Sequence, residues 1–196
     1  MEKLIVKFTN CVFVQTHFNE IEIVKIGIGL SIFLENITKA IIILLAAYIV
    51  GVLKISLIII AAYALLRYFA FGIHAKSSMN CLLISLLQDV FVPLVLKGLN
   101  INQNLMIFFA LVFCLLIKKY APADTDNHPL YNVKVRKELN CKATILSCFV
   151  LIATFLKVRS DIVKWILLSE LYVVIGILPI TYKLLKRRYK NYEKVV

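Results

Sequence analysis

The stretch that decides the fold is residues 40–66, which read AIIILLAAYIVGVL, then Lys54, then ISLIIIAAYALL. Lys54 is the only charged residue in this stretch. A water-soluble fold of this size has too little interior for such apolar runs, whereas a lipid bilayer accepts them. The stretch therefore predicts two membrane-crossing helices joined by a tight turn at Lys54. A single long helix kinked at Gly51 is the alternative.

Similar apolar runs recur outward from this stretch, and 61% of all residues are apolar, against about 45–50% in soluble domains. The pattern predicts an all-α integral membrane bundle with about six transmembrane helices. The predicted spans are residues 37–53, 55–73, 79–96, 101–117, 143–157 and 162–181. Several are shorter than the roughly 20 residues of a perpendicular span, so a thinned bilayer or snorkelling Lys and Arg would have to accommodate them.

The N-terminal residues 1–36 are mixed rather than continuously apolar. Apolar residues recur there at helical spacing, as in Leu4, Ile5, Phe8, Val12, Ile23 and Ile26. We expect two short amphipathic helices that lie in the membrane interface, or a cytosolic helical cap on the bundle. The chain would then divide into this segment, a transmembrane bundle over residues 37–182 and a basic tail over residues 183–196.

The charge is strongly basic, with 23 Lys and Arg against 11 Asp and Glu. The basic residues lie between and beyond the apolar runs, which favours contact with anionic lipid and argues against nucleic acid. With the N-terminus inside, 18 of the 23 basic residues fall on the inner side. The positive-inside rule therefore predicts that both termini are cytoplasmic.

The five cysteines and three histidines do not form metal-ligand spacings or CxxC pairs. We therefore expect neither a disulfide framework nor a metal site, and no cofactor. Cys11, Cys114, Cys141 and Cys148 have no evident partners and are interpreted as ordinary small apolar or boundary residues.

Residues 67–81 read RYFAFGIHAKSSMNC and place His74 seven residues before Cys81. A straight helix would put these two residues about 10 Å apart along its axis, too far for the hydrogen bond of a nucleophile and its base. A Cys81 nucleophile with a His74 base therefore requires a break in the helix between about residues 72 and 79. Gly72 supplies the backbone freedom, and Ser77 or Ser78 could cap the helix that carries Cys81.

This Cys–His pair also has a plain interpretation, because a cysteine in an apolar helix is usually a small apolar residue and a histidine at a membrane boundary is often interfacial. If the helix begins just before Cys81, its positive end and His74 would both favour the thiolate, the competent nucleophile.

Acidic residues near or inside the predicted spans are the other candidates. Residues 121–127 read APADTDN, where Asp124 or Asp126 could orient His74 or could cap the next helix. Asp89 and Glu170 fall inside predicted spans, where carboxylates usually face the bundle interior and are functional or paired. Either could orient His74 or bind basic residues of a peptide.

The RYFAFGIHAKSSMNC and APADTDN segments, in this order, resemble the accessory gene regulator B family of bacterial membrane endopeptidases that process a quorum-sensing propeptide. The resemblance covers nearly the whole chain. It implies that Cys81, assisted by His74, forms a thioester with the propeptide, which then cyclises to a thiolactone or, in some relatives, a lactone. It also implies a homodimer in the bacterial cell membrane. Arg67 and Gly72 match family positions, although they could simply be a snorkelling arginine and a close-packing glycine.

The cationic segments 118–142 and 183–194 predict that the propeptide presents an acidic segment near its cleavage site. The substrate-binding candidates are Lys134, Arg136, Lys137 and, for basic peptide residues, Glu170. A non-catalytic peptide exporter or scaffold subunit is the alternative function. Against an exporter, the chain is small and has no paired broken helices related by a repeat.

Overall fold

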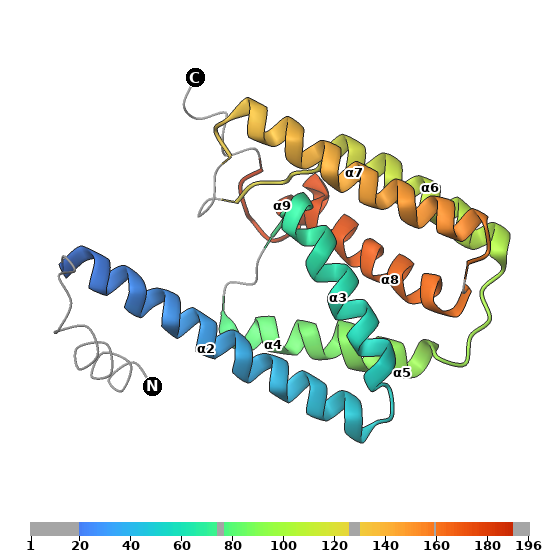
Figure 1. Cartoon of the computed structure of the whole chain (residues 1–196), viewed down its shortest axis with the longest axis horizontal. Coiled ribbons are helices and arrows are strands. Elements are labelled where there is room, and N and C mark those ends of the chain that lie inside the picture. Colours follow the sequence, from blue (N-terminus) through green and yellow to red (C-terminus); the bar gives the residue numbers. More distant parts are fainter. Residues whose placement is uncertain (1–19, 74–76, 126–129, 159, 190–196) are drawn as a thin grey trace. The chain divides into compact units, whose positions relative to one another are not determined.

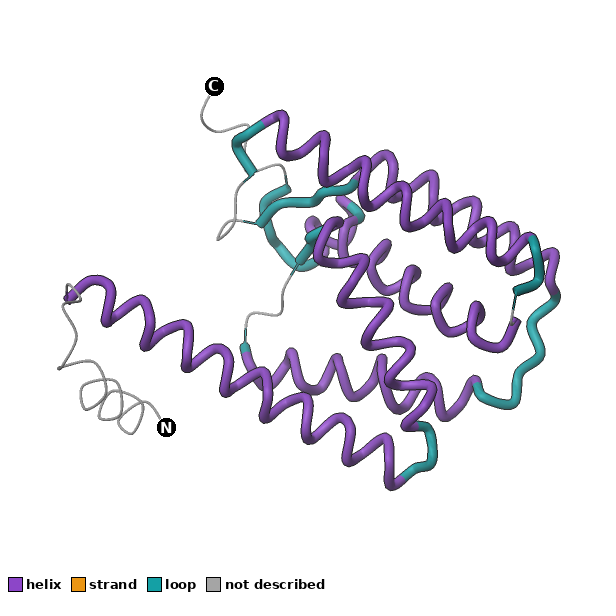
Figure 2. Tube along the Cα trace, in the orientation of Figure 1, coloured by secondary structure: helices purple, strands orange, loops and turns teal. Residues whose placement is uncertain are grey.

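The computed structural model describes residues 20–73, 77–125, 130–158 and 160–189, and the regular structure in these ranges is helical (Figures 1 and 2). The elements are α2 (Glu20–Ile49), α3 (Leu53–Ala70), α4 (Ser78–Leu86), the π-helix η1 (Leu87–Phe91), α5 (Val92–Leu96), α6 (Gln103–Tyr120), α7 (Val133–Phe155), α8 (Ser160–Ile177) and α9 (Pro179–Leu184). The all-α prediction is confirmed. An isolated β-bridge joins Phe71 and Ala123.

Five of the described helical segments are long and apolar enough to cross a membrane. They are Val24–Ile49, Leu53–Ala70, Ser78–Leu96, Gln103–Tyr120 and Val133–Phe155. The predicted sixth span, residues 162–181, corresponds to α8 and the start of α9. The helix α8 is as long as α3, but its 18 residues include Asp161, Lys164 and Glu170, so that, unlike the other five, it has no 18-residue stretch with two charged residues or fewer.

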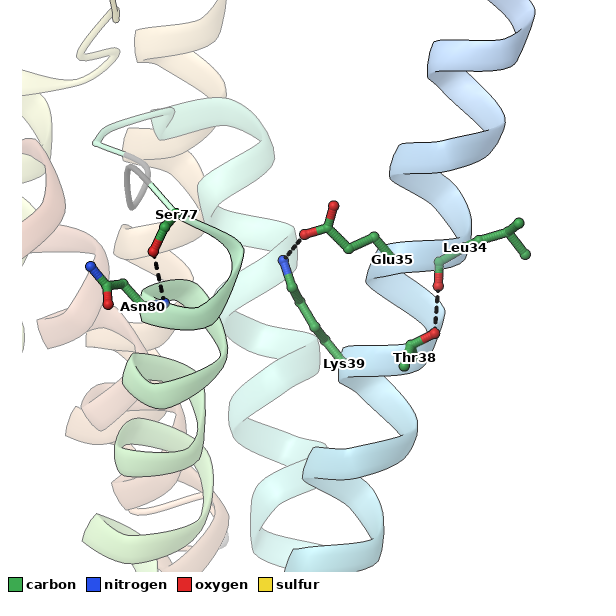
Figure 3. A network of polar contacts seen from close by, with 6 residues as sticks. All are labelled: Leu34, Glu35, Thr38, Lys39, Ser77 and Asn80. Atoms are coloured by element: carbon green, nitrogen blue, oxygen red, sulfur yellow. Dashed lines mark hydrogen bonds and ion pairs between the residues drawn. The ribbon is translucent and has the colours of Figure 1, made fainter. Parts of the chain in front are cut away.

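The N-terminal part of the bundle differs from the prediction in one respect. The helix α2 is continuous from Glu20 to Ile49, so no helix end falls at the expected boundary between an amphipathic helix ending near residue 36 and a span beginning at residue 37. The polar residues there are satisfied within the helix, because Lys39 pairs with Glu35 at 2.6 Å and the Thr38 hydroxyl donates to the Leu34 carbonyl at 2.9 Å (Figure 3). The first expected amphipathic helix lies outside the described residues.

The chain forms two compact units, Met1–Ala46 and Ala47–Val196. The functional division into an interfacial segment, a bundle and a basic tail stays a prediction.

A tight turn joins α2 and α3, as the sequence predicts, but it lies at residues 50–52 rather than at Lys54, which is the second residue of α3. Gly51 has φ +73°, its N–H donates to the Tyr48 carbonyl at 3.1 Å, and the Val52 N–H donates to the Ala47 carbonyl at 2.9 Å. A left-handed glycine with these two bonds is a Schellman ending of a helix. The alternative of one kinked helix is therefore excluded.

The core of the second unit lies where α3, α6, α7 and α8 pack together, with α6 and α7 side by side (Figure 1). Ala70, Ala110 and Ala143 are fully buried in this core. Small residues at such positions let helix backbones approach closely in a membrane, where dispersion rather than hydrophobic exclusion drives association.

The π-helix η1 joins α4 and α5 and packs against α3. Its backbone carbonyls receive side-chain bonds from two helices. The Ser56 hydroxyl donates to the Asp89 carbonyl at 2.5 Å, and the Tyr172 hydroxyl donates to the Gln88 carbonyl at 3.1 Å. A π-turn interrupts the regular helical bonding pattern and leaves carbonyls for such partners, so η1 is a point of attachment for the helix that carries Cys81.

The helix α7 begins at Val133, ten residues before the predicted span at 143. The Asn132 side chain caps it by accepting hydrogen bonds from the Lys134 and Val135 amides at 2.9 and 3.4 Å. The sequence prediction followed apolar residues alone and therefore missed the basic first turns of this helix.

Candidate active site

Cys81 lies half-buried in the first turn of α4. Ser77 is the N-cap residue, and its hydroxyl oxygen accepts a hydrogen bond from the Asn80 amide at 3.2 Å (Figure 3). The Cys81 amide donates to the Ser77 carbonyl at 3.0 Å, the first bond of the helix. The predicted serine cap is therefore confirmed, and Cys81 lies where the partial positive charge of a helix end stabilises anions.

The chain leaves helical structure at Ala70 and re-enters it at Ser78. This confirms the predicted helix break to the extent that residues 71–73 and Ser77 are described and are not helical. His74 itself lies outside the described residues, so its pairing with Cys81 stays a prediction. What the structure does give is the environment of the backbone that leads to it.

That backbone turns sharply and receives the Arg67 side chain. Phe71 has φ +57° and Gly72 has φ +115°, both in the left-handed region. Arg67 Nη2 donates to the carbonyls of Gly72, at 3.3 Å, and of Ile73. The Arg67 guanidinium also lies over the Tyr63 ring, 5.4 Å from its centre. Arg67 thus binds the two carbonyls that precede His74, which is more specific than the snorkelling boundary role that the sequence allowed.

Gly72 is required for two reasons. Its positive φ disfavours any side chain, and an added Cβ would lie 2.9 Å from the carbonyl oxygen of Gly176 at the end of α8. The Ile73 amide donates to this same carbonyl at 3.1 Å. Both interpretations of Gly72, as a bend and as a close-packing residue, therefore apply.

Gly176 is a site residue that the sequence reasoning missed. A Cβ there would lie 3.1 Å from Arg67 Nη1, so the absence of a side chain makes room for the arginine. The available signal was a lone glycine near the end of an apolar helical run, which often has a packing reason.

The segment before His74 pairs with the second sequence motif. The Gly72 amide donates to the Ala123 carbonyl at 2.8 Å, and the Ala123 amide donates to the Ala70 carbonyl at 3.0 Å. We call residues 70–73 and 121–124 together the loop junction. The structure thus brings the two motifs into contact, about 50 residues apart in the chain.

Asp124 is buried in the loop junction, with 1% of its surface exposed. Asp126, the other candidate for orienting His74, lies outside the described residues. Asn140 on α7 was not predicted, although its Nδ2 donates to the carbonyls of Ala121 at 2.6 Å and of Lys118 at 2.9 Å. No local pattern identifies such a residue, because its partners belong to another helix and a loop.

A cleft of about 390 Å³ opens beside the loop junction, and we call it the basic cleft. Residues 121–124 form one wall, and Lys119, Arg136, Lys137, Asn140 and Tyr189 line the rest together with neighbouring side chains. Arg136 and Lys137, two of the predicted substrate-binding residues, therefore meet at this cleft. Lys134 is exposed in the first turn of α7 and is not among the lining residues.

A family model described as Accessory gene regulator B matches residues 5–177, nearly all of the chain. This protein belongs to the accessory gene regulator B family. The family resemblance that the two motifs indicated is therefore confirmed, and it accords with the apolar helices of a membrane protein of the agr quorum-sensing system.

Curated relatives match over most of both chains. The protein is 40% identical over 173 residues to a putative AgrB-like protein of Clostridium acetobutylicum, covering 88% of this chain and 82% of the relative. A putative AgrB-like protein of Listeria monocytogenes serovar 1/2a is 38% identical, with 87% and 83% covered. The accessory gene regulator protein B of Staphylococcus aureus strain MW2 is 30% identical, with 86% and 89% covered. No solved structure matches.

The intramembrane candidates Glu170 and Asp89 do not belong to the loop junction. Its carboxylate is buried in the bundle interior, where the Ser147 hydroxyl of α7 donates to Oε1. Oε2 is buried without a hydrogen-bond partner among the described residues. Asp89, in η1, is half-buried. Among the described residues, no three His, Cys, Asp or Glu side chains gather as metal ligands would.

Proposed function

We propose that this membrane protein is a cysteine endopeptidase that cleaves the C-terminal segment from a quorum-sensing propeptide through a thioester on Cys81. The enzyme would then promote cyclisation of the remaining peptide to a thiolactone or lactone. The observation that carries the proposal is the loop junction. It fixes the backbone directly before His74, while a capped helix presents Cys81 seven residues later.

The reaction balances without any redox step. His74 accepts the Cys81 thiol proton, and the sulfur attacks the carbonyl carbon of the scissile peptide bond. The C–N bond breaks, the leaving amine takes the proton from His74, and a Cys81 thioester remains. A thiol or hydroxyl of the same peptide then attacks the thioester carbonyl, closing the ring and releasing the Cys81 thiol.

The second step explains why a thiol suits this chemistry. Exchange of one thioester for another keeps the energy of the activated acyl group, whereas hydrolysis would lose it. Exclusion of water from the acyl-enzyme favours cyclisation.

Arg67, Gly72 and one of two aspartates have supporting roles in this proposal. Arg67 and Gly72 would set the path of the backbone into His74 through the contacts described above. Asp124 or Asp126 would orient the His74 imidazole. Glu170 was a candidate for binding basic peptide residues, but its burial against Ser147 favours a role inside the bundle.

The basic cleft would bind the acidic segment of the propeptide, with Arg136 and Lys137 as the cationic groups, and the exposed Lys134 in the first turn of α7 would add positive charge. Attraction between exposed charges weakens as salt screens it. We therefore expect propeptide binding to weaken with ionic strength and with Lys137→Gln. Binding indifferent to both changes would remove the cleft from the substrate site.

We further propose that the chain is a homodimer of the bacterial cell membrane with both termini in the cytoplasm, in contact with anionic lipid. Exposed Cys141, near the start of α7, offers a test of sidedness. An impermeant thiol reagent should label Cys141 only after cells are permeabilised. Labelling in intact cells would indicate the opposite topology, and an exclusively monomeric mass in detergent would contradict the dimer.

The function is tested by cleavage of a synthetic propeptide in proteoliposomes. We expect Cys81→Ser and His74→Ala to lose cleavage while inserting normally. Cys141→Ser is the matched control and should cleave like the wild type. Retained cleavage by either of the first two variants would remove that residue from the mechanism. A wild-type protein that binds the propeptide without cleaving it would favour an exporter or scaffold.

A further inference from the structure

The helix α9 contributes one side chain that reaches the loop junction. Tyr182 is almost completely buried, with 1% of its surface exposed. Its hydroxyl donates to the main-chain carbonyl of Asp124 at 2.9 Å. The bond therefore joins residues that are 58 positions apart in the chain.

This hydroxyl binds the loop directly next to its contact with the segment before His74. Asp124 follows Ala123, whose carbonyl accepts from the Gly72 amide and whose amide donates to the Ala70 carbonyl. Two hydrogen bonds, one from the Tyr182 hydroxyl to Asp124 and one from the Gly72 amide to Ala123, therefore connect Tyr182 to Gly72 through two adjacent loop residues. His74 lies two residues beyond Gly72 in the sequence.

The same contacts form a closed ring. The Ile73 amide donates to the Gly176 carbonyl at the end of α8, and α9 follows α8 after a single extended residue, Leu178. The ring runs from the end of α8 through residues 73–70, the loop 121–124 and Tyr182, and returns along α9. Removing the tyrosine hydroxyl would open this ring at one point.

The hydroxyl and the aromatic ring of Tyr182 make two separate contacts. The aromatic ring packs edge-to-face on Tyr189, with 5.2 Å between ring centres, so a phenylalanine would keep this packing. The hydroxyl, in contrast, contributes a directed bond that leaves the Asp124 carbonyl without this donor when it is lost. The two contributions can therefore be separated by one substitution.

We infer that Tyr182 is a positioning residue: its hydroxyl fixes the loop 121–124, and this loop fixes the backbone that presents His74 to Cys81. The inference rests on the proposed function. It makes α9 a part of the catalytic apparatus, although α9 contributes no reacting group.

The test compares Tyr182→Phe with Ser169→Ala in the proteoliposome cleavage assay. Ser169 is the control, because it is also buried and its hydroxyl also donates to a main-chain carbonyl, that of Ile166 in its own helix α8. We expect Tyr182→Phe to lower kcat about 3- to 10-fold, the range of one hydrogen bond, with KM unchanged. Ser169→Ala should keep the wild-type kcat, although both variants lower the midpoint of thermal unfolding.

A second readout is the rate of Cys81 alkylation by iodoacetamide, measured on protein that elutes as a folded species. We expect His74→Ala to slow alkylation, and Tyr182→Phe to slow it by a smaller factor than His74→Ala does. An equal loss of kcat in Tyr182→Phe and Ser169→Ala, or wild-type kcat and alkylation in Tyr182→Phe, would overturn the inference. Failure of the proposed function is distinguishable, because the wild-type protein would then not cleave the propeptide, or Cys81→Ser and His74→Ala would cleave it like the wild type.

Discussion

The loop junction and the Ser147–Glu170 pair both bury polar groups within the second unit, but they do so in opposite ways. In the loop junction, backbone amides and carbonyls of two non-helical segments satisfy one another, and Gly72 has a positive φ. In the Ser147–Glu170 pair, two side chains bond between regular helices, and one carboxylate oxygen has no partner among the described residues.

The difference indicates which region is specialised. Strained backbone persists only where surrounding structure fixes it, and such positions concentrate at functional sites. A side-chain hydrogen bond between helices requires no unusual backbone conformation, and it contributes only modestly to membrane helix association. We therefore expect changes in the loop junction to reduce activity, and changes in the Ser147–Glu170 pair to reduce stability.

The largest expected effect is that of Gly72→Ala. A Cβ at φ +115° would be strained and would lie 2.9 Å from the Gly176 carbonyl oxygen. A strained position costs about 1–3 kcal/mol, so we expect cleavage activity to fall about 10- to 100-fold. The measurement is kcat/KM on protein that has inserted normally.

Gly51→Ala is the matched control for this prediction. Gly51 also has a positive φ, +73°, but an added Cβ would meet no atom within 4 Å. We expect a loss of stability of about 1 kcal/mol and no loss of activity per folded molecule. Equal loss of activity in both variants would mean that the loop junction is no more specialised than a helix-ending turn.

A smaller effect is expected from Ser147→Ala, which removes the donor to Glu170. We expect the free energy of unfolding to fall by about 1 kcal/mol, while activity per folded molecule is unchanged. Ser169→Ala is the control, because the buried Ser169 hydroxyl donates to the Ile166 carbonyl of its own helix. Loss of activity in Ser147→Ala at normal stability would assign Glu170 a role in the reaction.

The sequence predicted the helices where apolar runs are continuous and failed where they are not. The break after Ala70 and the cap at Ser77 follow from local chemistry, and the structure has both, whereas the tight turn was predicted at Lys54 and lies at Gly51. The continuity of α2 was missed because polar residues such as Glu35 were expected to interrupt a span. They are instead satisfied within the helix.

The site was predictable only in its local parts. Arg67, Gly72 and Cys81 belong to one short motif, so the sequence identified them together. The contacts of Asn140 and Tyr182 join segments about 20 and 58 residues apart. Periodicity reports which face of a helix is apolar, but it does not report which distant loop a polar side chain will meet.

The most direct test of the account is a search for the thioester itself. A propeptide whose internal nucleophile is replaced by alanine cannot cyclise, so its acyl group should remain on the enzyme. Intact-mass and peptide mass spectrometry of the proteoliposome reaction should then find the peptide attached through Cys81, with the adduct removed by hydroxylamine. The account predicts this adduct on the wild-type protein and none on Cys81→Ser. Cleavage of the propeptide with no adduct on Cys81, or with an adduct on another residue, would contradict it.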